Sequence, residues 1–126
     1  MTYAKLLHEI IERGIEGAKK DYAEKPNKLE GAVAGFEACR QRTPEQLHDL
    51  LKRAEGATWQ ARQSHYDGKL SIDEYWKLRC YEAEVEWVCN CISVALANQG
   101  EKPIIPPTAR ALMLVNTIFK ANEVQA

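Results

Sequence analysis

The four cysteines are the side chains best suited to bind a metal or to do redox chemistry, and they are Cys39, Cys80, Cys89 and Cys91. One residue separates Cys89 from Cys91, and on a helix two such positions point about 200° apart. One tetrahedral zinc ion cannot bind two sulfurs that face opposite ways. Disulfides require an oxidising compartment, so we expect buried thiols in the core, with no metal and no cofactor.

The loop that ends at Glu74 resembles the calcium loop of EF-hand proteins. Gly68 falls at the sharp turn of that loop, and Glu74 falls at its final ligand position. Gln63 and His65, however, occupy the first and third ligand positions, where calcium requires carboxylates. The sequence favours the alternative, a plain helical hairpin in which Gly68 is left-handed and Ser71 caps the next helix.

Two short acidic motifs resemble halves of metal sites in helical enzymes. Glu45 and His48 match the Glu-x-x-His motif of di-iron carboxylate bundles, which need that motif twice and not once. Glu9 and Glu12 resemble the first metal-binding half of the all-helical nucleotide pyrophosphatases of the MazG type. The second paired-acid half of that pattern is absent. Solvated helix faces are the interpretation that we favour for both motifs.

Arg42 and His48 resemble the Arg-x4–6-His signature of HEPN-type ribonucleases. That family has a polar residue, often Asn or His, directly after the arginine, whereas Thr43 and then Pro44 follow here. The resemblance implies an alternative function, a helical metal- or nucleotide-dependent hydrolase or ribonuclease using Arg42 and His48. We favour an exposed polar histidine, because a helix cap falls inside the motif.

Apolar residues outside the regular patterns are candidates for binding a partner. Trp59 lies about 135° from the centre of the apolar stripe of its helix, so either another element covers it or it anchors a partner. Ile104 and Ile105 lie between prolines and must be docked or presented. Phe119 belongs to a last helix that is apolar around much of its circumference. The candidate partner-binding residues are therefore Trp59, Ile104, Ile105 and Phe119.

Apolar residues recur at helical spacing along the chain, and no segment alternates as a strand does. The sequence predicts an all-α fold, a compact five-helix bundle in one domain that covers residues 1–126. The expected helices span about 2–21, 27–41, 43–66, 71–98 and 108–121.

Helix starts are marked by capping residues. Thr43 with Gln46, and Ser71 with Glu74, have the spacing of a capping box, and Asn27 with Glu30 has the same spacing. Thr108 is expected to cap the last helix, and Gly100 to end the fourth.

The fourth expected helix carries two apolar stripes on nearly opposite sides. One stripe contains Ile72, Trp76, Cys80, Ala83, Trp87 and Val94, and the other contains Leu78, Val85, Cys89, Ile92 and Leu96. A helix that is apolar on two sides is packed between two layers, so we expect this helix to be central. Small residues also recur in the first two helices (Gly14, Gly17, Gly31 and Gly35), which predicts that these two helices pack closely together.

Composition and charge narrow the classes of function. The 126 residues include 17 basic and 18 acidic side chains, a net charge of −1, which disfavours a nucleic-acid partner. No run approaches the roughly 18 apolar residues of a membrane span, and no signal peptide precedes the first amphipathic segment. We therefore expect a cytoplasmic protein with no membrane partner.

These observations favour a non-catalytic, helical, protein-binding module over an enzyme. The catalytic motifs are incomplete, and the chain has more apolar surface than so small a bundle can cover. We expect self-association, as a two-fold homodimer along the last helix and the loop before it. Small helical proteins of this kind are often phage or mobile-element accessory proteins, including inhibitors of host systems.

Overall fold

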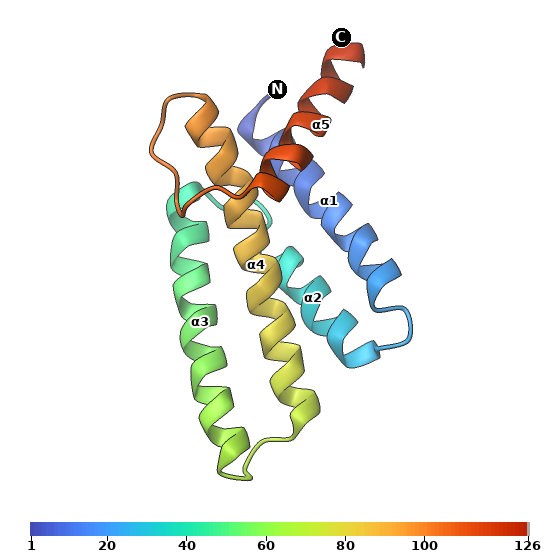
Figure 1. Ribbon diagram of the computed structural model, residues 1–126, viewed down its shortest axis with the longest axis vertical. Helices are drawn as coiled ribbons and strands as arrows, with labels where there is room; N and C mark the ends of the chain where they lie inside the picture. Colours follow the sequence, from blue (N-terminus) through green and yellow to red (C-terminus); the bar gives the residue numbers. More distant parts are fainter. Residues whose placement is uncertain (126) are drawn as a thin grey trace.

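The computed structural model describes the backbone of residues 1–125 and the side chains of residues 1–121, and this part of the chain is helical with no strand (Figure 1). The helices are α1 (Tyr3–Asp21), α2 (Pro26–Ala38), α3 (Pro44–Tyr66), α4 (Ile72–Asn98) and α5 (Ala109–Gln125). The predicted all-α five-helix bundle is therefore confirmed.

Helix α4 is the centre of the bundle, as its two apolar stripes predict. Each of the other four helices packs against it. Helices α3 and α4 form a long antiparallel hairpin, while α1 and α2 lie on the other side of α4 and α5 crosses its C-terminal half (Figure 1). Helix α3 contacts no described helix except α4, which leaves its outer side open.

The two halves of α4 differ in how completely they are covered. From Val88 to Ala95 every side chain except that of Asn90 is buried, because α1 and α5 lie over this half. At the N-terminal end Ile72, Trp76 and Ala83 are exposed, although the sequence predicts them to face inward. That part of the prediction is wrong, because no described helix fully covers Ile72 and Trp76, and Ala83 lines a groove between α1, α2, α4 and α5.

Most of the expected helix boundaries follow from their caps. The Thr43 hydroxyl accepts a hydrogen bond from the Gln46 N–H (3.2 Å), and the Gln46 side chain accepts one from the Thr43 N–H (3.0 Å), so this capping box is confirmed. The Ser71 hydroxyl accepts from the Glu74 N–H (3.2 Å). Gly68 and Gly100 have φ of 73° and 76°, the left-handed conformation that ends α3 and α4.

The expected boundaries of α2 are wrong at both ends. The helix begins at Pro26, and Lys25 precedes it without a side-chain cap, so Asn27 lies inside the helix. Proline in the first turn starts this helix, because its missing N–H would have no partner there. The helix ends at Ala38, and Gln41 has φ of 59°, which turns the chain toward α3.

The glycines of α2 bring it close to α4 and not to α1. A Cβ added at Gly31 would lie 2.2 Å from the Lys77 carbonyl oxygen, and one added at Gly35 would lie 2.6 Å from the Tyr81 carbonyl oxygen. Only residues without a side chain allow two helix backbones to approach this closely. The predicted α1–α2 contact exists at Gly14, which faces Phe36, but the closer approach joins α2 to α4.

Candidate functional site

The outer face of α3 is the most prominent exposed aromatic surface among the described side chains. Trp59 is 63% exposed and Tyr66 is 74% exposed. They are seven positions apart in the sequence, which places both on the same side of the helix, two turns apart. The sequence leaves open whether another element covers Trp59. In the structure no described element covers it, so the tryptophan is exposed.

Residues at alternating spacings of four and three continue this face along α3. We call the set the α3 outer stripe, and it consists of His48, Lys52, Glu55, Trp59, Arg62 and Tyr66. Lys52 and Glu55 take part in no ion pair among the described side chains. Arg62 contacts no carboxylate in that part of the chain, and its guanidinium lies 3.4 Å from the Tyr75 hydroxyl. The stripe therefore presents aromatic rings and charges of both signs, and Lys52 and Glu55 have no ion-pair partner among the described side chains.

Aromatic contacts extend this surface across the tip of the hairpin. The His65 ring stacks on Tyr75 with centroids 6.1 Å apart, and Tyr75 lies beside Trp76 at 5.8 Å. His65 is partly buried, and its Nδ1 lies 3.0 Å from the Leu70 carbonyl oxygen. Within the described residues, no group of three His, Cys, Asp or Glu side chains is arranged to hold a metal ion.

The other three candidate residues lie away from α3. Ile104 and Ile105 are half-buried against the core, and their backbone N–H groups donate to the hydroxyl of the buried Ser93 at 3.0 and 3.1 Å. Phe119 on α5 is also half-buried against the core. Helices α3 and α5 do not touch each other, so the structure does not bring Trp59 together with these three residues.

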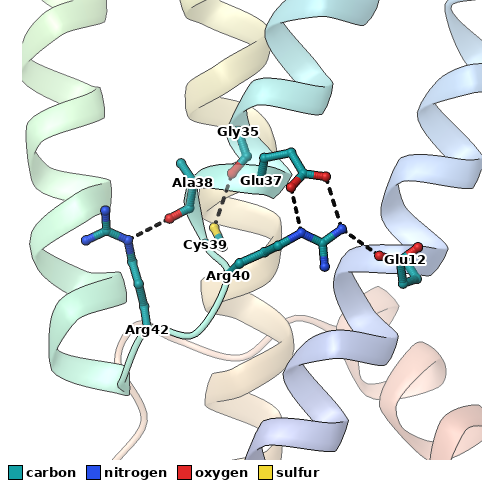
Figure 2. Close-up of polar contacts among 7 residues, drawn as sticks. All are labelled: Glu12, Gly35, Glu37, Ala38, Cys39, Arg40 and Arg42. Atoms are coloured by element: carbon teal, nitrogen blue, oxygen red, sulfur yellow. Dashed lines mark hydrogen bonds and ion pairs between the residues drawn. The ribbon is translucent and has the colours of Figure 1, made fainter.

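Arg42 and His48 are not joined by any described contact. The Arg42 side chain donates to the Ala38 carbonyl oxygen at 2.6 Å, at the C-terminus of α2 (Figure 2). The Tyr3 hydroxyl donates to the Arg42 carbonyl oxygen at 2.6 Å. His48 is half-buried and forms no hydrogen bond with another described residue. The Arg42 side chain thus caps the C-terminal end of α2.

The acids of α1 that resemble a metal-binding half are held in ion pairs. Arg40 forms ion pairs with Glu37, near the end of α2, and with Glu12 of α1. The nitrogen–oxygen distances are 2.6 and 2.5 Å (Figure 2). Glu9 pairs with Arg13 at 3.6 Å. The hydrogen bond from Arg40 holds the pKa of Glu37 below its usual range. The contacts of Arg40 tie α1 to the end of α2.

A groove formed by α1, α2, α4 and α5 is a feature that the sequence does not indicate. It has a volume of about 520 Å³. Its walls carry charged side chains of both signs, namely Arg13, Asp21, Glu84, Glu86 and Arg110. Burial, with a smaller contribution from nearby Asp21, raises the pKa of Glu84 to about 7. Arg110 lies over the Trp87 ring with its guanidinium carbon 5.3 Å from the centroid. The mixed charges select no particular class of ligand.

The four cysteines are free and buried, as the sequence predicts. The Cys39 thiol donates to the Gly35 carbonyl oxygen at 3.3 Å, and the Cys89 thiol to the Leu47 carbonyl oxygen at 3.5 Å. Burial raises the pKa of Cys39, Cys89 and Cys91 to about 12. Reactive cysteines need the thiolate form, so these thiols are structural.

Comparison with protein-family models, with curated proteins and with solved structures gives no match. No described helix combines the length and the apolar character needed to cross a membrane.

Proposed function

We propose that the protein is a non-catalytic helical module that binds another protein through the α3 outer stripe. The observation that carries the proposal is the exposure of Trp59 on a helix that packs on one side only. Burying a tryptophan and a tyrosine is a large source of binding free energy, and these two residue types are enriched at the centres of interfaces. Exposed to water, the two rings add little to the stability of the folded monomer.

The stripe also has the composition of a binding surface and not of a catalytic site. It is convex, with polar residues around its aromatic centre, whereas small-molecule sites are concave. Its single histidine, His48, has no described hydrogen-bond partner to orient it. A general base needs such an orienting group, so the stripe supports binding without chemistry.

Self-association is one form that this binding can take, since every molecule meets other copies of the same chain. The loop of Ile104 and Ile105 packs against the core, so its apolar area is already partly used within the chain. Among the described side chains of α5, the large apolar ones that are exposed are Leu112 and Met113. An accessory protein or inhibitor from a phage or mobile element would act in the same way, by covering a surface of its target.

Site-specific photo-crosslinking in cells that naturally express the protein tests the proposal. A photoreactive phenylalanine derivative replaces Trp59, and the matched control carries it at Lys19, an exposed position on α1. We expect discrete crosslinked products from position 59 that excess purified wild-type protein suppresses, and none from position 19. Equal crosslinking from both positions would contradict a binding surface on α3.

A separate measurement tests the statement that the module is not catalytic. The purified protein is heated with metal ions and with nucleotides, and hydrolysis of nucleotides and RNA is followed in parallel. We expect no saturable rise in melting temperature and no turnover. Turnover that is lost on both Arg42→Ala and His48→Ala would instead establish the alternative, a hydrolase or ribonuclease.

A further inference from the structure

Charged and aromatic side chains of the α3 outer stripe lie at equal or nearly equal distances on either side of Trp59. Lys52 lies seven residues before Trp59 and Tyr66 lies seven residues after it. Glu55 lies four residues before and Arg62 three residues after. Lys52 on one side could therefore attract the Tyr66 ring on the other, and Glu55 could attract Arg62.

An antiparallel pair of α3 helices would bring these groups together. At 1.5 Å of rise per residue, Lys52 and Tyr66 lie about 10.5 Å from Trp59 along the helix axis, in opposite directions. When a second α3 runs antiparallel with Trp59 opposite its own copy, each Lys52 ammonium reaches the Tyr66 ring of the other chain. Glu55 and the other chain's Arg62 are offset by only about 1.5 Å along the axis.

The positions around the helix agree with this pairing. At 100° per residue, Glu55 and Arg62 lie about 40° and 60° to the same side of Trp59. A two-fold axis perpendicular to the plane of the two helices keeps that side in common, so both ion pairs form along one edge of the contact. Lys52 and Glu55 have no described ion-pair partner within the chain, so their charges are available to a second copy, while Arg62 would exchange its 3.4 Å contacts with the Tyr75 hydroxyl for the new ion pair.

We propose that the occupant of the α3 outer stripe is a second copy of the same chain, bound antiparallel with Trp59 at the two-fold axis. This inference rests on the proposed function, since it names the partner for that surface. The contact is isologous, so two cation–ring contacts and two ion pairs form for every pair of tryptophans. Complementary charges at the edge fix the direction and register of the helices, which aromatic contacts alone do not.

Charge reversal with rescue tests the pairing. Sedimentation equilibrium of the full chain measures the dimer dissociation constant for wild type, Glu55→Arg, Arg62→Glu and the double variant at low salt. In each single variant the new side chain lies opposite a like charge of the other chain, so we expect dimer affinity to weaken about tenfold or more. The double variant, and an equimolar mixture of the two single variants, should regain wild-type affinity, because opposite charges then face each other again.

Two control variants show whether the loss of dimers is specific to the contact along α3. Glu16→Arg reverses an exposed acid on α1, and it should leave the dissociation constant within about twofold of wild type. Trp59→Ala should abolish dimers while circular dichroism shows an unchanged helix content.

A monomeric wild type at all concentrations would overturn the inference, as would single reversals that change nothing or a mixture that shows no rescue. If the chain is monomeric but position 59 crosslinks to a different protein in cells, the binding proposal stands and only the second copy fails as the occupant. If neither dimers nor position-specific crosslinks form, both fail.

Discussion

Replacing Gly31 with alanine tests the close approach of α2 to the N-terminal half of α4. The added Cβ would lie 2.2 Å from the Lys77 carbonyl oxygen and 2.8 Å from the Lys77 Cα. These are backbone atoms of α4, so they cannot rotate aside as a side chain does. One of the two helices must therefore shift.

The expected size of the effect follows from two opposing contributions. Overpacking costs about 1–3 kcal/mol, and the better helix propensity of alanine offsets about 1 kcal/mol of it. Because the obstacle is backbone, we place the overpacking at the upper end and expect a net loss of about 2 kcal/mol in the free energy of unfolding. Gly17→Ala is the matched control, since nothing lies within 4 Å of a Cβ there. It should gain about 0.5–1 kcal/mol.

Urea unfolding followed by far-ultraviolet circular dichroism measures both variants against wild type. The same substitution should therefore move the midpoint in opposite directions, down for Gly31 and up for Gly17, with similar slopes. A Gly31→Ala protein as stable as wild type would refute the close contact between the two helix backbones.

Three further predictions concern the turn, the thiols and the groove. Gly68→Val should lower the free energy of unfolding by more than about 1 kcal/mol, because a β-branched residue resists a φ of 73°, and calcium should not change the melting temperature. The thiols of Cys89 and Cys91, whose pKa values are raised to about 12, should resist alkylation at pH 8 until urea unfolds the chain, and rapid native labelling would contradict their burial. Glu84 has a folded-state pKa raised from 4.5 to about 7, so folding takes up a proton between these values and stability should fall as the pH rises through this window. Glu84→Gln should flatten that part of the pH profile of unfolding, and an unchanged profile would contradict the buried carboxyl.

The sequence predicts the helices well where local signals and long-range packing agree. Thr43 and Gln46 form a complete capping box in sequence, and the structure has both of its hydrogen bonds. At Asn27 the same kind of signal misleads, because Pro26 can start the helix one residue earlier. Two local signals compete here, and the proline sets the start of the helix because its missing N–H needs no partner in the first turn.

The candidate site is predicted in part for a similar reason. Trp59 lies far from the apolar stripe of its own helix, and this angle alone indicates that α4 does not cover it. Whether a different helix covers Trp59 depends on the arrangement of all five helices. The raised pKa of Glu84 is beyond reach of the sequence, because it arises where α4 meets Asp21 of α1 and Arg110 near the start of α5.

Burial of Trp59 with rising protein concentration is the most direct test of α3 as a binding surface. Hydroxyl-radical footprinting of the purified protein from nanomolar to high micromolar concentration measures oxidation of individual side chains by mass spectrometry. Met113 on α5, 71% exposed, serves as the internal reference. We predict that oxidation of Trp59 and Tyr66 falls steeply with concentration while that of Met113 stays constant. Protection of Met113 with Trp59 unchanged would contradict the account and place the contact on α5 instead.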